Sequence, residues 1–400
     1  MTKYKYVLYG ATDRINYGDN LMPLVVIEFL SKYAQEGFET KNYGTIRSDL
    51  AKFKALPTYP VKEMYNDPFV EGSTVVLVGG EVMVARWGKI LSFCYDLAYR
   101  ARRIRGVNRL FSDRLARLFL GGATEYPFVL SEKDFKYGCS VVYNSVGGPR
   151  KPLQDMVVEP LSQAKYISVR DHDSARNFND SAGDIAVEIT PDSCILMSEF
   201  YPLDRLEKMV EPEVHEFSKG HPYIFFQVGL SKSKGKVDQL AKQLIAAASG
   251  QSLKICLCPI GRAPGHHDQI ALEQIYDEIV KRGHKDLVVF FPEPTLWDVM
   301  ILIAKAKVYI GTSLHGVITA QSFGVPYIGI NQSLKKVNQY LSSWAPPELA
   351  EVYPLGKWLD QFNIIMDLLH GTTDLTDKIE TLTDQQMSIS RESLTKMLLS

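Results

Sequence analysis

The chain of 400 residues has little of what marks several large classes of protein. Its five cysteines are odd in number and include no Cys-x-x-Cys pair, so the sequence predicts neither a disulfide framework nor a metal site. No apolar run reaches the roughly 18 residues of a membrane span. The N-terminus also lacks the apolar core and cleavage site of a signal peptide. We therefore expect a cytoplasmic protein.

Neither sign of charge is in excess, because 45 Lys and Arg face 46 Asp and Glu, for a net charge of −1. Such a balance gives no overall positive field, so nucleic acid is not an expected partner. The His-Glu-x-x-His, Gly-x-Ser-x-Gly and Gly-Lys-Ser/Thr motifs are missing from the sequence. Metalloprotease, serine hydrolase and P-loop NTPase functions therefore have no support.

Short apolar runs recur along the chain, each followed by Gly, Pro or Asp and then by a segment of helical periodicity. This pattern is typical of parallel strands joined by crossover helices, and we predict two α/β domains. The expected strands are residues 4–9, 74–78, 140–146, 166–169, 185–189, 223–228, 253–259, 287–291, 308–310 and 327–330. A proline-rich and charged stretch, residues 200–222, marks the boundary between the two domains. We place the N-terminal domain in residues 1–205, the C-terminal domain in 206–370, and a polar, loosely packed helical tail in 371–400.

Parallel sheets bind ligands outside the carboxyl ends of their strands, so the residues that follow each strand are the candidates for a site. Here these residues are unusually polar and rich in glycine. We expect them to converge on one cleft between the domains. The candidates are Asn16, Gly18, Asp19, Gly80, Glu81, Arg170, Asp192, Gln227, Arg262, Thr312, Ser313 and His315.

Residues 308–330 are the most informative segment, because they read as strand, tight turn, helix, stop and strand. His315 falls in the first helical turn, where free backbone N–H groups and the helix dipole favour a phosphate or carboxylate. The alternative is a polar residue that only caps the helix. Arg170 likewise has two interpretations, a planar cation that grips an anion or an exposed ion pair with Asp171.

Residues 99–119 contain seven arginines and one acid. Apolar side chains fall at helical spacing on one side of this stretch, at Ile104, Val107, Phe111, Leu115 and Leu118. A basic amphipathic stretch over residues 100–117 can lie on an anionic membrane surface. The alternative is a charged outer face over a buried apolar stripe.

The order of these motifs resembles the polysaccharide pyruvyl transferase family. The matching motifs are residues 16–19 (Asn-Tyr-Gly-Asp), 79–80 (Gly-Gly), 168–171 (Ser-Val-Arg-Asp), 191–192 (Pro-Asp), 258–259 (Cys-Pro), 314–316 (Leu-His-Gly) and 324–326 (Gly-Val-Pro). The resemblance implies two Rossmann-like domains that face each other across a cleft, as in GT-B glycosyltransferases. In this arrangement the acceptor lies on the N-terminal side and the donor on the C-terminal side.

The resemblance also implies an activity, the transfer of pyruvate from phosphoenolpyruvate to two hydroxyls of one sugar as a cyclic ketal. Arg170 would hold the phosphate or carboxylate of the donor, and His315 would bind the phosphate and act as acid or base. Many members carry arginine two places before this histidine, where this chain has Ser313. Arg262 or Lys335 could replace the missing cation.

An enol ether is activated by protonation at its methylene carbon while its negative groups stay neutralised, which suits a histidine near a helix N-terminus. The sugar hydroxyls then need a base or hydrogen-bond acceptor, and Asp19, Glu81 and Asp192 are unranked candidates. The scheme uses phosphoenolpyruvate as a substrate and needs no metal or cofactor. The expected acceptor is a sugar or lipid-linked oligosaccharide of a cell-surface polysaccharide, such as an exopolysaccharide or capsule, at the inner face of the membrane.

Two alternatives stay open at the level of sequence. The same architecture could serve a glycosyltransferase that uses a nucleotide sugar, with Glu293 near the position of an acid that binds the ribose hydroxyls. The chain could also be a degenerate, non-catalytic glycan-binding protein, which Ser313 suggests. The oligomeric state does not follow from the sequence.

Overall fold

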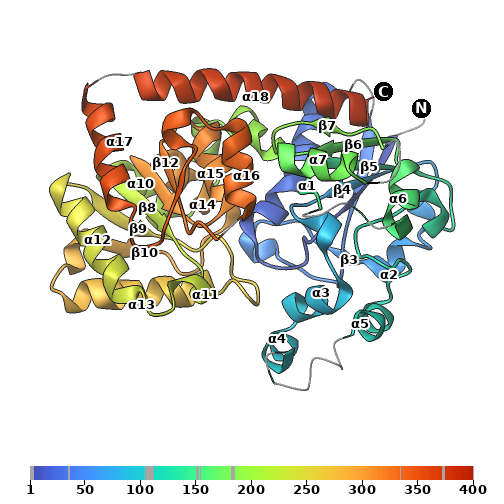
Figure 1. Ribbon diagram of the computed structural model, residues 1–400, viewed down its shortest axis with the longest axis horizontal. Helices are drawn as coiled ribbons and strands as arrows, with labels where there is room; N and C mark the ends of the chain where they lie inside the picture. Colours follow the sequence, from blue (N-terminus) through green and yellow to red (C-terminus); the bar gives the residue numbers. More distant parts are fainter. Residues whose placement is uncertain are drawn as a thin grey trace. The chain divides into compact units, whose positions relative to one another are not determined.

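The computed structural model describes residues 4–34, 37–102, 104, 112–149, 153, 155–181, 185–333, 335–371 and 374–399. The chain forms two compact units, unit 1 of Met1–Ser193 with Ser388–Ser400 and unit 2 of Cys194–Met387 (Figure 1). The first segment of unit 1 thus ends at Ser193, which is earlier in the chain than the domain boundary at residues 205–206 placed from the sequence. Two of the prolines that suggested a linker, Pro202 and Pro212, instead lie at the starts of helices of unit 2, because proline fits the first turn of a helix.

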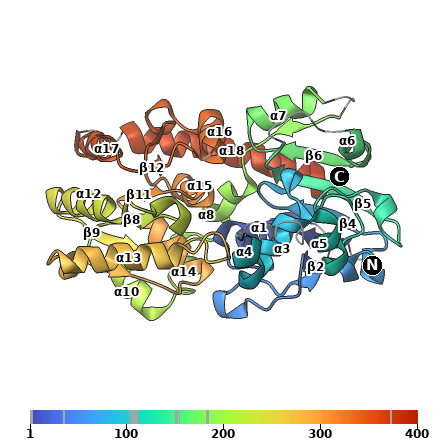
Figure 2. The same cartoon turned by 60° about the horizontal axis from the view of Figure 1, so that its bottom comes forward.

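In unit 1, seven strands of the described chain form one parallel sheet in the order β3-β2-β1-β4-β5-β6-β7. Figures 1 and 2 show β4, β5 and β6 side by side. The strands are β1 (Tyr4–Tyr9), β2 (Phe38–Gly44), β3 (Tyr59–Pro60), β4 (Thr74–Val78), β5 (Ser140–Val146), β6 (Tyr166–Val169) and β7 (Glu188–Ile189). The helices are α1 (Tyr17–Tyr33), α2 (Val61–Met64), α3 (Trp87–Cys94), α4 (Asp96–Arg102), α5 (Asp113–Leu120), α6 (Asp155–Ser162) and α7 (His172–Asn179).

The direction of strand order in this sheet reverses between β1 and β4. From β1 the chain adds β2 and β3 on one side, and from β4 it adds β5, β6 and β7 on the other. Because βαβ crossovers are right-handed, the two directions put their connecting helices on opposite faces. The carboxyl ends of β1 and β4 therefore form the topological switch point at which such sheets bind ligands.

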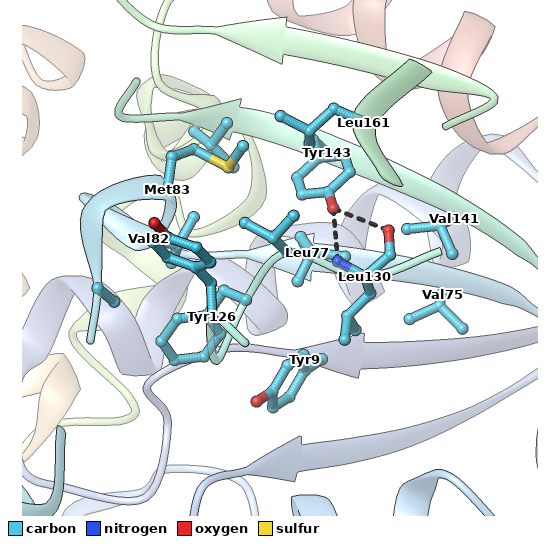
Figure 3. Close-up of a cluster of buried hydrophobic side chains, with 14 of the residues drawn as sticks. Tyr9, Val75, Leu77, Val82, Met83, Tyr126, Leu130, Val141, Tyr143 and Leu161 are labelled. Atoms are coloured by element: carbon cyan, nitrogen blue, oxygen red, sulfur yellow. Dashed lines mark hydrogen bonds between the residues drawn. The ribbon is translucent and has the colours of Figure 1, made fainter. Parts of the chain in front are cut away.

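The core of unit 1 contains apolar side chains from the central strands and from the chain that precedes β5 (Figure 3). The Tyr143 hydroxyl donates to the carbonyl of Leu130 at 3.1 Å and accepts from the N–H of Leu130 at 3.0 Å. The Tyr9 hydroxyl donates to the carbonyl of Pro127 at 2.8 Å. These two buried hydroxyls thus have partners, and their hydrogen bonds hold the segment before β5 against the sheet.

In unit 2, six parallel strands of the described chain form a sheet in the order β10-β9-β8-β11-β12-β13. The strands are β8 (Tyr223–Gln227), β9 (Lys254–Leu257), β10 (Val288–Phe290), β11 (Val308–Gly311), β12 (Tyr327–Ile330) and β13 (Val352–Tyr353). The helices are α8 (Met197–Phe200), α9 (Leu203–Leu206), α10 (Pro212–Gly220), α11 (Leu230–Ser233), α12 (Val237–Gly250), α13 (Asp268–Lys281), α14 (Leu296–Ala304), α15 (Leu314–Ser322), α16 (Lys335–Trp344) and α17 (Leu359–Gly371). Helix α12 packs on α13, and α14 packs on α15. The switch point of this sheet lies between β8 and β11.

The C-terminal helix α18 (Asp374–Leu398) corrects the expectation of a loosely packed tail. Its residues up to Met387 belong to unit 2, where the Thr383 hydroxyl donates to the carbonyl of Gln321 at 2.9 Å. Its later residues belong to unit 1, where the hydroxyls of Ser393 and Tyr166 are 2.9 Å apart. The sequence did not indicate this packing, because several buried side chains of α18 are polar. Within the described chain, no helix, α18 included, is both long enough and apolar enough to cross a membrane.

Candidate active site

The ends of β1 and β4 meet at Gly10, the first residue after β1. A Cβ atom added at Gly10 would lie 1.9 Å from the carbonyl oxygen of Val78, the last residue of β4. Only glycine therefore permits this approach. The loop that leads to α1 and the Gly79–Gly80 turn both start here, so two glycine-rich segments singled out in the sequence lie at the switch point of unit 1.

Arg170 and Asp192 follow the neighbouring strands β6 and β7 and form a buried ion pair. Arg170 Nη1 donates to Asp192 Oδ2 at 3.0 Å, and the two side chains are 3% and 0% exposed. Burial opposes the charge of Arg170, but the carboxylates of Asp192 and Glu81 outweigh it and raise the pKa of the guanidinium. The structure thus joins two residues that the sequence assigned to separate roles, and it places a permanent cation at the edge of the sheet.

Two glycines lie against the guanidinium of Arg170. A Cβ atom at Gly80 would be 3.4 Å from both terminal nitrogens, and one at Gly147 would be 3.1 Å from Nη2. The N–H of Gly147 donates to the carbonyl of Gly80 at 2.7 Å, which holds the two loops together. Bulkier residues at these positions would displace the cation. The loops after β4 and β5 therefore leave the space that Arg170 fills.

Asp171 does not form the exposed ion pair with Arg170 that the sequence left open. Asp171 Oδ1 accepts from the N–H of Ser174 at 2.7 Å, and Oδ2 accepts from the Ser174 hydroxyl at 2.9 Å. The Ser174 hydroxyl in turn accepts from the N–H of Gly148 at 2.9 Å. Asp171 is thus the N-cap of α7, and it anchors the loop after β5.

Asn16, Gly18 and Asp19 lie at the start of α1. Asn16 Nδ2 donates to Asp19 Oδ2 at 2.6 Å, and the N–H of Asn16 donates to Asn20 Oδ1 at 3.1 Å. Asp19 is half-buried in the first helical turn, where the helix dipole favours a carboxylate. Gly18 is buried within the same turn. These residues form a compact polar group at the carboxyl end of β1.

The sequence reasoning missed a second buried charge pair in the same loop. Asp13 Oδ1 accepts from Arg14 Nε at 2.7 Å, while Oδ2 accepts from the N–H groups of Thr45 and Ile46 at 2.6 and 3.0 Å. Burial opposes the charge of Arg14, but Asp13 outweighs it and raises the pKa of Arg14. Thr45 and Ile46 follow β2, a strand that the sequence did not predict, so the partners of Asp13 could not be anticipated.

In unit 2, the turn between β11 and α15 forms as the sequence predicted. The Ser313 hydroxyl accepts from the N–H of Gly316 at 3.4 Å and caps α15, and Gly324 adopts φ 69° beyond its end. His315 lies in the first turn of α15 and is 8% exposed. The carbonyl of His315 accepts from the Thr319 hydroxyl at 2.7 Å. His315 therefore lies at the positive end of a helix.

The ring of Tyr309 lies under this turn and explains its glycines. Cβ atoms added at Gly311 and Gly316 would be 2.2 and 2.1 Å from the Tyr309 hydroxyl. This hydroxyl donates to the carbonyl of Ser313 at 3.3 Å. The backbone before and after Ser313 can therefore approach the aromatic ring only because both positions lack a side chain.

A buried chain of hydrogen bonds crosses the switch point of unit 2. Gln227 ends β8 and lies opposite Gly311 of β11. Gln227 Oε1 accepts from the N–H and hydroxyl of Thr312 at 3.0 and 3.2 Å, and Nε2 donates to Asp268 Oδ2 at 2.7 Å. The chain fixes the orientation of the amide and holds the turn that leads to His315.

Asp268 is the second residue that the sequence reasoning missed. Its Oδ2 also accepts from the N–H groups of Gly261 and Ile260 at 2.8 and 3.2 Å. Its Oδ1 is buried and has no hydrogen-bond partner in the described part of the chain. Burial raises the pKa of Asp268, although these hydrogen bonds oppose the shift. From the sequence, Asp268 reads as an ordinary acid in a first helical turn.

Arg262 and Glu293, which the sequence assigned to competing functions, form one ion pair. Arg262 Nη2 and Glu293 Oε1 are 3.0 Å apart, and the two side chains are 14% and 53% exposed. Lys335, the other candidate cation, is exposed at the start of α16. Cys194 was also missed: its buried Sγ lies within 4.8 Å of a ring nitrogen of His315. Arg262 is thus a largely buried cation close to a strand end of unit 2, and Cys194 is a polarisable neighbour of the imidazole.

Comparison with solved structures defines the class of fold. The UDP-GlcNAc 2-epimerase of Neisseria meningitidis, bound to UDP-GlcNAc, is similar over 100% of both chains with a TM-score of 0.56 and 12% identity. The UDP-GlcNAc 2-epimerase of Methanocaldococcus jannaschii has a TM-score of 0.52 and 10% identity over 96% of this chain and 99% of that chain. A glycosyltransferase of Rickettsia africae has a TM-score of 0.52 and 13% identity over 100% of this chain and 97% of that chain. The protein therefore has a GT-B-type fold of two parallel-sheet α/β domains.

The sequence adds a family to this fold. The model of the family described as polysaccharide pyruvyl transferase matches residues 16–333, a span that contains every motif on which the resemblance rests. The chain belongs to this family. No curated protein matches it in sequence.

Proposed function

We propose that the protein transfers pyruvate from phosphoenolpyruvate to two hydroxyls of one sugar, as a cyclic ketal, in the synthesis of a cell-surface polysaccharide. The observation that carries the proposal is the family match over residues 16–333. The buried guanidinium of Arg170 at the edge of the first sheet is the kind of group that such a donor requires. Phosphoenolpyruvate has two anionic groups, and a planar guanidinium binds either of them with two parallel hydrogen bonds.

Each unit supplies its own part of the proposed chemistry. In unit 1, Arg170 binds a negative group of the donor, and Asp192 holds the guanidinium in position through their 3.0 Å contact. In unit 2, His315 binds phosphate beside the N–H groups of the α15 turn and transfers protons. Ser313 and Thr312 complete that turn with hydroxyl groups.

The reaction needs one proton donor and one acceptor. His315, when protonated, gives a proton to the methylene carbon of the enol, so the tertiary carbon becomes electrophilic. One sugar hydroxyl adds to this carbon and gives its proton to the base. The carbon–oxygen bond to phosphate then breaks, and phosphate leaves with the proton held by the base. The second hydroxyl closes the ketal and returns a proton to the neutral His315. The half-buried carboxylates of Asp19 and Glu81 suit the role of base better than Asp192, because Asp192 is fully buried and already paired with Arg170. The scheme uses no metal and no cofactor.

We further propose that the enzyme is cytoplasmic and acts on a sugar or oligosaccharide still attached to a lipid carrier at the inner face of the membrane. Other candidate contacts of the donor or acceptor are Asn16, Gly18, Gly80, Gln227, Arg262 and Lys335.

Calorimetry and thermal shift with phosphoenolpyruvate, compared with a panel of nucleotide sugars, test the proposal. Phosphoenolpyruvate is expected to stabilise the wild type and Arg170→Lys is expected to bind it more weakly. His315→Ala is expected to lose the stabilisation, while the matched control His284→Ala, at an exposed histidine of unit 2, keeps it. Stabilisation by nucleotide sugars instead, with none by phosphoenolpyruvate, would refute the assigned chemistry.

A nucleotide-sugar glycosyltransferase is the second candidate, favoured by the half-exposed carboxylate of Glu293 and by the structural similarity to proteins solved with UDP-GlcNAc. Under this alternative, Glu293→Gln weakens nucleotide-sugar binding and leaves phosphoenolpyruvate without effect. Glycan binding without turnover of either donor would indicate a non-catalytic glycan-binding protein.

A further inference from the structure

Helix α5 carries both buried and exposed apolar side chains. Ala116 and Leu120 are buried against the rest of unit 1, as expected for an amphipathic helix. Leu115, Leu118 and Phe119 are 50%, 67% and 70% exposed. Their spacing of three and four residues places them in one stripe beside the buried face formed by Ala116 and Leu120.

Helices α4 and α5 both pack on α3 (Figures 1 and 2), and one ring contact links the exposed stripe of α5 to the residue before α4. The rings of Tyr95 and Phe119 meet edge to face with centroids 6.2 Å apart. Leu97, in the first turn of α4, is 80% exposed, and Ile104, just beyond α4, is 58% exposed. We call the set Tyr95, Leu97, Ile104, Leu115, Leu118 and Phe119 the apolar patch.

The apolar patch corrects one expectation from the sequence. Ile104, Leu115 and Leu118 are exposed, so the stripe is not buried under a charged outer face. Val107 and Phe111 lie outside the described residues. An exposed cluster of large apolar side chains on a soluble domain usually marks a surface that something else covers.

Positive charge surrounds the apolar patch. The described residues of the segment 86–120 contain six Lys and Arg but only two Asp. One of these acids, Asp113, is engaged locally, since its Oδ1 accepts from the N–H of Gly88 at 2.9 Å. Lys89, Arg100 and Arg114 are exposed on α3, α4 and α5. The surface therefore combines apolar side chains with a local excess of cations in a chain whose net charge is only −1.

We infer that the apolar patch and its surrounding arginines bind the surface of an anionic lipid bilayer. Leucine and phenylalanine side chains enter the boundary between headgroups and acyl chains, while arginines pair with lipid phosphates. A second copy of the chain fits this surface less well, because it would bring two arginine-rich rims together. The inference does not depend on pyruvyl transfer, although a bilayer at this surface would bring lipid-linked acceptors close to unit 1.

Liposome sedimentation of the full chain, without donor or acceptor, tests the inference. The vesicles are phosphatidylcholine alone or with about a third of phosphatidylglycerol, a composition that supplies the negative surface on which polybasic segments depend. The wild type is expected to bind only the anionic vesicles and to dissociate as salt is raised. Replacing Arg100 and Arg114 by Glu is expected to lower the partition coefficient at least about 25-fold, from about fivefold per arginine. Replacing Leu118 and Phe119 by Ser is expected to reduce binding with little loss of thermal stability, because both side chains are exposed.

Two matched controls separate this surface from general effects. Ile364 and Leu368 of α17 are 52% and 36% exposed at a spacing of four residues, in a helix without Lys or Arg. Their change to Ser, and the change of the exposed Lys281 and Lys285 to Glu, should leave vesicle binding unaltered. Wild-type binding by both patch variants, or equal losses in the controls, would overturn the inference. A shift from dimer to monomer in the Leu118/Phe119 variant, without lipid binding by the wild type, would show instead an interface between two copies.

Discussion

Replacing Asp268 by alanine removes the common acceptor of three hydrogen bonds in unit 2. Asp268 Oδ2 accepts from Gln227 Nε2 and from the N–H groups of Gly261 and Ile260 at 2.7, 2.8 and 3.2 Å. A buried donor that loses its acceptor costs about 1–3 kcal/mol. We take values near the lower limit, because water can enter the space that the carboxylate leaves and because the longest bond is weak. The expected loss is about 3–4 kcal/mol in the free energy of unfolding of unit 2.

Asp268→Asn is the matched control, because it keeps one oxygen at the Oδ2 position and removes the buried charge. Its amide group would occupy the Oδ1 position, which has no hydrogen-bond partner in the described chain. Because burial raises the pKa of Asp268, the folded state binds this proton more tightly than the unfolded state. Wild-type stability therefore falls as pH rises above the ordinary value of 3.8 and through the pKa of the folded state. Asparagine lacks this dependence, so the variant should gain on the wild type as pH rises from about 3.8 through the pKa of the folded state.

Urea unfolding followed by tryptophan fluorescence can isolate unit 2. Trp297, Trp344 and Trp358 belong to unit 2, and Trp87 belongs to unit 1. A Trp87→Phe background therefore reports the unfolding of unit 2 alone. A loss below about 1 kcal/mol for Asp268→Ala would refute the reasoning, since it is less than the cost of one unpaired donor. Equal losses for the alanine and asparagine variants at pH 7 would refute it as well.

Four further predictions concern unit 1 and the local environment of its residues. Arg170→Lys keeps the charge but not the planar fork, so calorimetry should show phosphoenolpyruvate affinity about tenfold lower or weaker. Asp192→Asn removes the carboxylate that binds the buried guanidinium, and it should cost about 3–5 kcal/mol in urea unfolding. Burial raises the pKa of Cys94 to about 12. Its alkylation at pH 8, measured by mass spectrometry, should therefore be about a thousandfold slower in the native than in the unfolded protein. Equal rates would contradict this assignment. Gly10→Ala should lower stability by on the order of 3 kcal/mol, because its Cβ would overlap a backbone oxygen of β4, while Gly220→Ala, with nothing within 4 Å, should melt like the wild type.

Most strands could be predicted because central strands of parallel sheets are buried on both faces and read as continuous apolar runs. β8 is buried at every position, and its bounds agree with the prediction within one residue. β2 was missed because its sequence, Phe-Glu-Thr-Lys-Asn-Tyr-Gly, has polar residues that find partners only in the fold. Within it, Asn42 Nδ2 donates to the hydroxyls of Thr12 and Thr58 at 3.2 and 3.1 Å. β3 and β13 have two residues each, too few for any periodicity.

In the candidate site, likewise, local sequence predicts where a residue lies along a strand, but it does not predict which side chains are its partners. That Arg170, Asp192 and His315 follow strands could be predicted, because strand ends are a local property of the sequence. That Arg170 meets Asp192 depends on β6 lying beside β7. The link from Gln227 to Thr312 depends likewise on β8 lying beside β11. Sheet order comes from packing of the whole domain, so no motif spacing reveals these partners.

Stability alone does not account for the Arg170–Asp192 pair. Removing both charges from water costs several kcal/mol per ion, and apolar residues of similar volume are often as stabilising as a buried ion pair. In this chain, Asp192 and Glu81 keep the guanidinium charged, while Gly80 and Gly147 leave it the space it occupies. Such support suits a cation with the proposed role of holding an anionic group of the donor. A cation that served only the core could be replaced by leucine or methionine, and the glycines around it would then have no purpose.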